Sequence, residues 1–365
     1  MIEKKVFLSG SGLREAFALI SPDDGRESPG AQLKRIADEL SSLLASEEFR
    51  GLRPVMKRWF LSDAANQKPL LPKETDCAVS VVEEPPLSRV KAVLWVWLME
   101  GVDYRVWNDG LFTARLGVFT HVFNTNIGFR GEDSGKTAEL ILSAADASLC
   151  GLGGTLARNC VRTWFYVRDI DADYRGMAEG RNRVFERCGL TSSTHFIAST
   201  GIGGASADPA VKVLFDAYSV IGLGEDAVKY ISVPDRMNPT HEYGVAFERA
   251  STVDYPDRRH LFVSGTASID HHGEIVCEGD VAGQTRRMIG NVDALLEKAG
   301  FSRCDIGYCF VYLRDMADYE TVDRIIAGEF PDMPYVILLA RVCRPGWLVE
   351  MECMAVKGKE PDKNP

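Results

Sequence analysis

The chain has 365 residues, of which 45% are hydrophobic and 26% are charged, and its formal net charge is −10. Such a length normally means two or three globular domains, and no stretch approaches the roughly 20 apolar residues that a membrane-spanning helix needs. The acidic balance and the absence of a basic stripe argue against nucleic acid as a partner, because binding to phosphates requires clustered Lys and Arg.

The nine cysteines are odd in number and scattered, mostly within apolar segments. This pattern is typical of reduced core residues and not of a disulfide framework. The N-terminal residues also lack the apolar core of a signal peptide. We therefore expect a cytoplasmic protein that does not associate with membranes.

The first region, residues 1–104, has the pattern of a small mixed unit. A strand is expected near residues 6–12, an amphipathic helix over 31–44, a strand from about residue 53, and two closing strands within 77–100. A second helix is missing from this region. It therefore reads as a degenerate copy of the two regions that follow.

The second region, residues 105–224, begins with strands over about 110–129 and continues with a helix over 134–149. An apolar strand follows at 160–167, then a helix over 175–188 and two closing strands. Residues 225–257 contain prolines and have weak periodicity, so we expect a linker or an elaborated loop there.

The third region, residues 258–358, is the most complete unit. Its expected order is β-β-α-β-α-β-β, including a second short strand at 275–278 after a turn. Asp280 is expected to cap the first helix and Gly300 to end it. The second helix is expected over 319–328 and the closing strands over 335–342 and 347–356. Residues 359–365 are expected to form a disordered tail.

Several motifs of the third region, FVSGTASID, VYLRDMADY and LVEMECMAV, resemble the YjgF/Rid superfamily, also described as endoribonuclease L-PSP-like. This resemblance implies an α+β fold in small units that trimerise with ligand clefts between neighbours. Three copies in one chain then imply an intramolecular pseudo-trimer that is monomeric. The alternative is two Rid-like domains behind an unrelated N-terminal domain.

The resemblance also implies catalytic residues on the last strand. In Rid-type deaminases a glutamate on this strand positions water, and the matching residue here is Glu350. Glu352 lies two residues further along and therefore on the same face of the strand. The arginine that grips the substrate carboxylate in those deaminases is missing, because Pro334 and Tyr335 occupy its place. The alternative is that both glutamates have no catalytic role and are simply exposed on an edge strand.

Other residues are candidates to bind an anionic substrate in its place. Arg162 and Tyr166 share a face of the apolar strand RTWFYV, although Arg162 also suits a structural ion pair with Asp169 or Asp171. The remaining candidates are a helical arginine and a loop rich in hydroxyls and glycine: Arg181, Ser199, Thr200 and Gly201.

The segment from RTWFYV to STGIG resembles chorismatases, which share the Rid fold and remove pyruvate from chorismate. These enzymes have a Cys seven residues before the acid-catalytic Glu, and Cys343 and Glu350 have this spacing. Cys343 is accordingly a further candidate binding residue, with an ordinary core position as the alternative.

Together these features predict a Rid-like hydrolase or deaminase that acts on a small anionic imine or enamine. Glu350 would serve as general acid or base, or would hold the attacking water. The alternatives are a chorismatase-like hydrolase that releases pyruvate from an enol ether, and a non-catalytic metabolite-binding protein. Neither a cofactor nor a metal is expected, because hydrolysis at such a carbon needs none and His271 and His272 lack further ligands at metal spacing.

Overall fold

The computed structural model describes residues 1–359 except residues 24, 74 and 75, so the expected tail lies outside the described residues apart from Lys359. Its strands form three sheets, which define the first, second and third units of the chain. Among the described residues, no helix combines the length and the apolar character needed to cross a membrane.

The first unit contains one long helix, α1, which begins at Pro29 after the Ser28 side chain accepts a hydrogen bond from the backbone of Ala31. As expected, the described part of this unit has no second long helix, and a short helix of four residues lies at that place in the chain. The elements are β1 (Ile2–Leu8), β2 (Arg14–Ile20), α1 (Pro29–Ala45), β3 (Leu52–Leu61), α2 (Ala64–Gln67), η1 (Lys68–Leu70), β4 (Ala78–Glu83) and β5 (Ala92–Glu100).

The second unit has two long helices that pack on each other. Gly180 of α5 permits this close approach, since a Cβ there would lie 2.2 Å from the carbonyl oxygen of Gly135 on α3. The elements are β6 (Asp103–Asn108), β7 (Leu111–Leu116), β8 (Phe119–Arg130), α3 (Ser134–Gly151), α4 (Leu156–Asn159), β9 (Cys160–Val167), α5 (Ile170–Arg187), β10 (Ala198–Gly203) and β11 (Val211–Ile221).

In the third unit, α6 begins and ends as expected. The Asp280 side chain accepts from the backbone of Gly283, and Gly300 adopts a left-handed φ of 76°. The elements are β12 (Val228–Ile231), η2 (Thr240–Tyr243), β13 (Ala250–Asp254), β14 (Arg258–Ala267), α6 (Val281–Ala299), η3 (Arg303–Asp305), β15 (Ile306–Leu313), η4 (Met316–Asp318), α7 (Tyr319–Glu329), β16 (Tyr335–Leu339) and β17 (Val349–Gly358).

Two local expectations are wrong. Residues 225–257 are not only a linker, because β12 and β13 add two antiparallel strands to the edge of the third sheet. Their short length and the intervening prolines hide this pairing from the sequence pattern. Residues 275–278 do not form a strand either, since a single bridge between Ile269 and Ile275 is all the pairing they make.

The three sheets repeat one strand order. Five strands of each sheet are arranged in the same way. From one edge to the other they are a hairpin strand, the first long strand, the closing strand, the central strand and an edge strand parallel to the central one. The orders are β1-β2-β5-β3-β4, β7-β8-β11-β9-β10 and β13-β14-β17-β15-β16. The second and third sheets carry one additional edge strand each, β6 and β12. This repetition confirms the α+β pseudo-trimer, whereas the division into separate domains at the expected boundaries stays a prediction.

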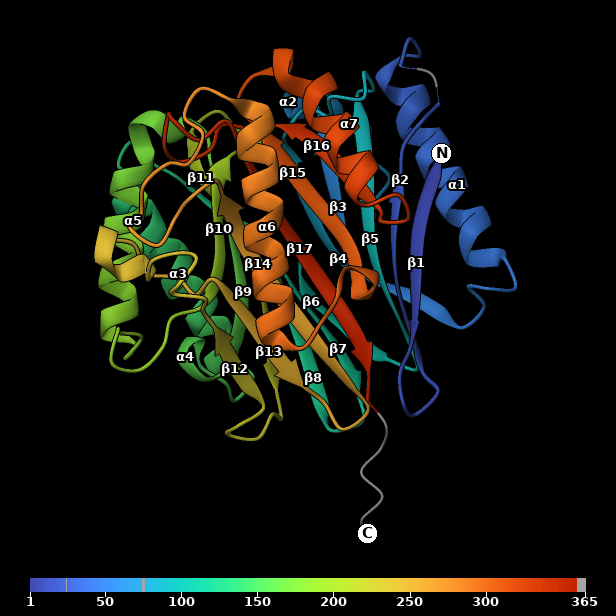
Figure 1. The fold of residues 1–365 in the computed structure, drawn as a ribbon. Coiled ribbons are helices and arrows are strands. Elements are labelled where there is room, and N and C mark those ends of the chain that lie inside the picture. Colours follow the sequence, from blue (N-terminus) through green and yellow to red (C-terminus); the bar gives the residue numbers. More distant parts are fainter. Residues whose placement is uncertain (24, 74–75, 360–365) are drawn as a thin grey trace.

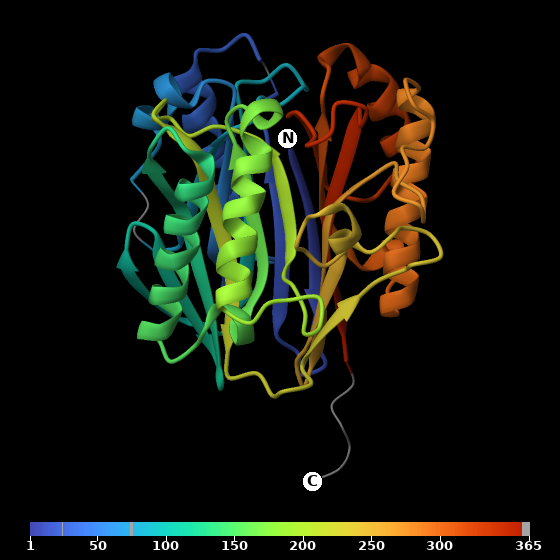
Figure 2. The same ribbon diagram turned by 90° about the vertical axis from the view of Figure 1, so that its left-hand side faces the viewer.

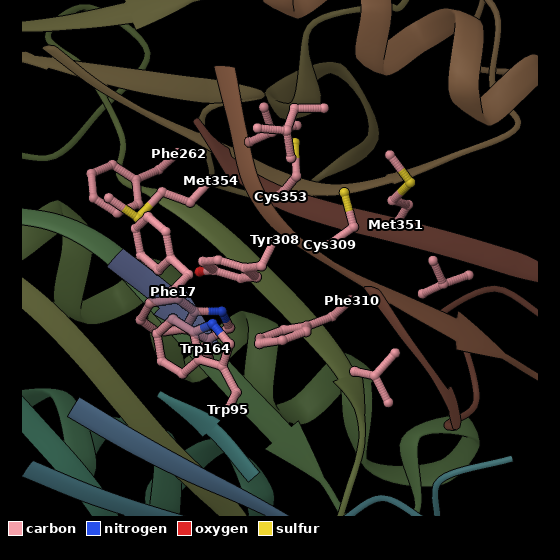
Figure 3. Packing of buried hydrophobic residues seen from close by; sticks show 14 of the residues in the cluster. Phe17, Trp95, Trp164, Phe262, Tyr308, Cys309, Phe310, Met351, Cys353 and Met354 are labelled. Carbon is pink, nitrogen blue, oxygen red and sulfur yellow. The ribbon is translucent and has the colours of Figure 1, made fainter. Parts of the chain in front are cut away.

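The sheets face inward and the long helices lie outside them (Figures 1 and 2). Aromatic side chains of different units meet in the shared core, as Figure 3 shows for Phe17 of the first unit and Tyr308 of the third, whose ring centroids are 5.3 Å apart. Trp95 lies 4.7 Å from the same tyrosine ring. Each unit therefore buries its inner sheet face against the other two, as an obligate trimer does.

Candidate active site

A cavity of about 200 Å³ lies between the second and third units. The second unit lines it from α5 and β10, and the third unit lines it from β14, β17 and the loops before β13 and β17. The lining residues are Tyr174, Arg181, Ser199, Thr200, Gly201, Val245, Phe247, Arg249, Gly265, Ala267, Ile269, Cys343, Arg344, Trp347 and Glu350.

Glu350 supplies the carboxyl group of the cavity, and it is only 5% exposed. Burial raises the pKa of Glu350 to about 8, and the negative charge of Glu352 acts in the same direction. Arg162 and Arg249 oppose this shift without cancelling it. Near neutral pH, Glu350 is therefore mainly a neutral acid that can donate a proton.

This shift makes a prediction for stability. The pKa of Glu350 is about 8 in the folded chain and 4.5 ordinarily. Between these two pH values the folded state holds a proton that the unfolded state has lost, so the free energy of unfolding falls as the pH rises. Replacing Glu350 with glutamine removes this penalty. From about pH 5 to about pH 8, we expect urea unfolding to show Glu350→Gln gaining on the order of 3 kcal/mol relative to the wild type. A pH-independent difference would contradict the raised pKa.

Three arginines supply positive charge to the same cavity, and two of them are almost completely buried. Arg181 is 1% exposed and Arg249 is 5% exposed. Arg249 donates to the backbone oxygen of Asn238 at 2.9 Å, which holds it at the cavity wall. Arg344 stacks on Trp347, with 4.6 Å between its guanidinium carbon and the ring centroid. Buried cations beside apolar walls suit a carboxylate-bearing ligand.

The loop residues Ser199, Thr200 and Gly201 lie at the cavity, as expected, although they belong to strand β10. Ser199 donates its backbone N–H to Ser264, and Thr200 accepts the backbone N–H of Gly265 at 2.9 Å. These two bonds join the second unit to the third at the floor of the cavity. Gly201 leaves space for Tyr174, whose ring would lie 3.0 Å from a Cβ.

Cys343 also lines the cavity, but as a neutral thiol. Burial raises the pKa of Cys343 to about 12, and the neighbouring Glu350 adds to the shift. A thiol with such a pKa is a poor nucleophile at neutral pH. Its contribution to a ligand is therefore one of shape.

Three of the expected site residues do not line the cavity. Glu352 accepts hydrogen bonds from Arg162 at 2.8 Å and from the indole of Trp164 at 2.6 Å, and all of this lies in the core. Arg162 thus makes a structural ion pair, but its partner is not Asp169 or Asp171. Tyr166 points toward Arg58, whose guanidinium carbon lies 5.6 Å from its ring centroid.

Sequence reasoning missed several lining residues. Val245, Phe247 and Arg249 belong to the segment expected to be a linker, where no periodic pattern marked them. This segment is tied to the second unit, because the backbone N–H of Phe196 donates to the Glu248 carboxylate at 2.8 Å. Arg344 could have been proposed from the sequence, since it directly follows the candidate residue Cys343.

Gly265 lies against the acid and leaves no room for a side chain. A Cβ at this position would lie 2.1 Å from Oε1 of Glu350 and 3.2 Å from the Thr200 side chain. We expect Gly265→Ala to push the Glu350 carboxyl group away and to lower turnover by about 100-fold, the effect of a displacement of about 1 Å in a catalytic group. Gly224→Ala, where a Cβ meets nothing within 4 Å, is the matched control. Equal rates in both variants would contradict this role.

The other two unit interfaces lack this acid. Equivalent positions follow from the pairing of each closing strand with its central strand, where Glu350 pairs with Tyr312, Leu214 with Tyr166 and Val93 with Phe60. A cleft between the third and first units, lined by α7, β16 and β5, therefore contains Val93 in place of the glutamate.

At the interface of the first and second units, Asn126 stands where Gly265 stands in the third unit, since both occupy the bulge opposite the closing strand. Its side chain accepts from the backbone of Val81 at 2.9 Å and donates to that of Val79. The asparagine thus fills this interface and bonds the edge of β4. Of the three equivalent positions, only the one between the second and third units combines a carboxylic acid with an open cavity.

The family described as Endoribonuclease L-PSP matches residues 247–357. The 3-aminoacrylate deaminase RutC of Acinetobacter baylyi is 32% identical to this chain over 98 residues, which are 26% of this chain and 77% of that protein. This chain belongs to the YjgF/Rid superfamily. The resemblance seen in the sequence motifs is thereby confirmed.

The Rid-like protein is also similar to a chorismatase of Streptomyces hygroscopicus, with 29% identity over 210 residues that cover 53% of this chain and 60% of that protein. This chain also superposes on a chorismatase crystal structure, over 85% of this chain and 96% of that one, with a TM-score of 0.67 and 22% identity. The two proteins therefore share a fold. These similarities support a hydrolase or deaminase function, or that of a chorismatase.

Proposed function

We propose that this protein hydrolyses a small carboxylate-bearing metabolite at an enol-ether or enamine carbon, with Glu350 as the general acid. The observation that carries this proposal is a buried carboxyl group, protonated at neutral pH, in the same cavity as Arg181, Arg249 and Arg344. A group that begins the reaction with its proton is suited to donate it, and less suited to activate water.

Vinylic substrates need such a donor. In an enol ether of pyruvate, Glu350 would protonate the terminal methylene carbon. The electrons of the double bond form the new C–H bond, and the adjacent carbon becomes part of an oxocarbenium ion. Water then adds to that carbon and loses a proton to the Glu350 carboxylate. In the resulting hemiketal the C–O bond to the leaving group breaks, the hydroxyl group loses its proton to become the carbonyl of pyruvate, and the leaving oxygen takes up a proton to give the alcohol.

The enol-ether substrate is favoured by similarity to a protein named chorismatase over 53% of this chain, which is more than the length of one unit. The spacing of Cys343 and Glu350 is that of the resemblance described above, and both side chains line the cavity. Arginines from both units face this cavity, so a dianionic ligand would be held from two sides. A chorismatase-like release of pyruvate is therefore the first activity to test.

Deamination of an enamine is the second candidate. It is favoured by the 32% identity to a 3-aminoacrylate deaminase, which covers 26% of this chain. Protonation of the enamine carbon by Glu350 would give an iminium ion, to which water adds before ammonia leaves. Arg249 or Arg181 would then take over the carboxylate contact of the missing Rid arginine.

The test is a pair of product assays on one protein preparation. Chorismate is supplied and pyruvate is measured with lactate dehydrogenase and NADH; in parallel, 2-imino acids and 3-aminoacrylate are generated in situ and ammonia is measured, with semicarbazide as the competing trap. Catalysed pyruvate release supports the enol-ether hydrolase, and catalysed ammonia release alone supports the deaminase. If neither product forms faster than in the absence of protein, the hydrolase proposal is wrong and a metabolite-binding role replaces it.

A further inference from the structure

The Arg162–Glu352 ion pair lies directly behind the acid of the cavity. Both side chains are 2% exposed, and Glu352 also accepts the indole N–H of Trp164. Glu352 lies two residues from Glu350 on one face of β17, so the two carboxyl groups are neighbours although only Glu350 reaches the cavity. A charge fixed at this place acts on Glu350 through the low-dielectric core.

The ion pair is connected to the cavity floor by hydrogen bonds across the unit interface. Arg162 donates to the Thr200 hydroxyl, and the backbone N–H of Gly265 donates to that same hydroxyl. Gly265 is in turn the residue whose missing side chain gives Glu350 its place. Glu352 is thereby tied to the acid by geometry as well as by charge.

The interface of the first and second units also has a buried ion pair on the closing strand, but without the acid. Asp216 corresponds to Glu352 on the closing strand and accepts from the Arg58 guanidinium at 3.0 Å, with both side chains fully buried. The residue two positions earlier is Leu214, the counterpart of Glu350. Because Leu214 replaces the acid at this interface, Asp216 provides a control for any additional role of Glu352.

The charged and titratable groups around Glu350 come from four elements. Glu352 on β17 disfavours the ionised form of Glu350, whereas Arg162 and Arg249 favour that form. The groups that face it are Glu352 on its own strand, Tyr312 on β15, Arg162 on β9, Tyr174 and Arg181 on α5, and Arg249, Cys343 and Arg344 on the loops.

We propose that Glu352 is a positioning residue that acts from outside the cavity and holds Glu350 in its proton-donating form at neutral pH. This inference rests on the proposed function for its meaning, but it can be tested without turnover. Hydrogen bonds from Arg162 and Trp164 hold the Glu352 carboxylate in place behind the acid, outside the cavity that Glu350 lines. The second unit, through Arg162 and Trp164, thereby sets the protonation state of an acid on the third.

The test is an infrared titration of Glu350. The C=O stretching band of its protonated carboxyl group is assigned by its loss in Glu350→Gln, and its amplitude is followed against pH in the full-length protein. Glu352→Gln is expected to lower the midpoint by about one pH unit or more, because a neighbouring negative charge is removed. Glu352→Asp retains the charge and is expected to keep most of the wild-type midpoint.

Asp216→Asn is the control, since Asp216 occupies the position of Glu352 on the closing strand of the second unit and is also buried in an ion pair. It is expected to leave the Glu350 midpoint unchanged. Unchanged midpoints in both Glu352→Gln and Asp216→Asn would overturn the inference, and so would equal shifts in both. Neither result depends on whether chorismate or an enamine is the substrate.

If Glu352→Gln does not fold, the double replacement Arg162→Met and Glu352→Met removes both charges together and leaves an apolar interface. A smaller shift in the same direction is then expected, because Glu352 acts on Glu350 more strongly than Arg162 does. A shift to higher pH in this double variant would overturn the inference. Where a substrate is known, the limb of the pH–rate profile that reports the acid moves with the infrared midpoint.

Discussion

Glu350→Gln is expected to lower kcat by about 10³-fold while leaving ligand affinity within a fewfold of the wild type, because general acid catalysis contributes 10²- to 10⁴-fold. Glutamine has the same shape and can still hydrogen-bond, but it cannot give a proton to a vinylic carbon. We expect the cavity and its three arginines to keep their arrangement, because the two side chains have nearly the same size. The measurement is release of pyruvate or ammonia, whichever the product assays establish, together with calorimetric titration of the substrate or a stable analogue.

The control for this variant is Asp323→Asn in the equivalent cleft of the third and first units. Asp323 accepts the hydroxyl of Tyr335 at 2.8 Å, and Val93 stands at the position of the acid in that cleft. Asp323→Asn is expected to keep full activity. If it lost as much activity as Glu350→Gln, or if Glu350→Gln remained active, the assignment of the reaction to the cavity between the second and third units would fail.

The second large effect concerns stability and involves Arg58, which lies at the junction of the three units. Its guanidinium carbon is 4.4 Å from the Trp164 ring centroid and 5.7 Å from that of Phe310, and its ion pair with Asp216 is fully buried. Arg58→Met leaves the Asp216 carboxylate buried without its cation. We expect a loss of about 3–5 kcal/mol in the free energy of unfolding, measured by urea denaturation.

The double variant Arg58→Met and Asp216→Leu supplies the comparison. Replacing both charges with apolar side chains is expected to restore most of the lost stability, since a buried ion pair is often no more stabilising than a well-packed apolar pair. The interface of the third and first units already has such a solution, because Phe310 and Trp95 pack edge to face there with centroids 5.7 Å apart. If the double variant were as unstable as Arg58→Met, the aromatic contacts of Arg58 would be the main source of its effect.

The equivalence of the three interfaces explains how one fold supports different tasks. Trp164, Arg58 and Phe310 occupy the same position on the central strands of the three units. Trp164 contacts Glu352 at one interface, Arg58 contacts Asp216 at the next, and Phe310 contacts Trp95 at the third. All three contacts fill the same space in the shared core. Fusion of the units removed the need for identical clefts, so a single cleft could keep a carboxylic acid and an opening for a ligand.

The family and the repeated architecture could be predicted from the sequence, because both depend on local patterns. Strand periodicity, the Asp280 cap and the Gly300 terminus are properties of short segments, and the motifs around Gly265 and Glu350 recur in fixed order. The same patterns placed Glu350, Arg181, Ser199, Thr200, Gly201 and Cys343 among the candidate residues, and all six line one cavity.

Which of these residues lie together could not be predicted in this way, because it depends on contacts between the units. Strand alternation puts Glu350 and Glu352 on the same face, yet the neighbouring unit covers one with Arg162 and Trp164 and leaves the other facing a cavity. Arg249 reaches that cavity from a segment whose strands pair only at the edge of a completed sheet. Burial, ion pairing and the opening of a cleft depend on contacts between residues far apart in the sequence, such as Arg162 and Glu352, which are 190 positions apart, and no local pattern encodes them.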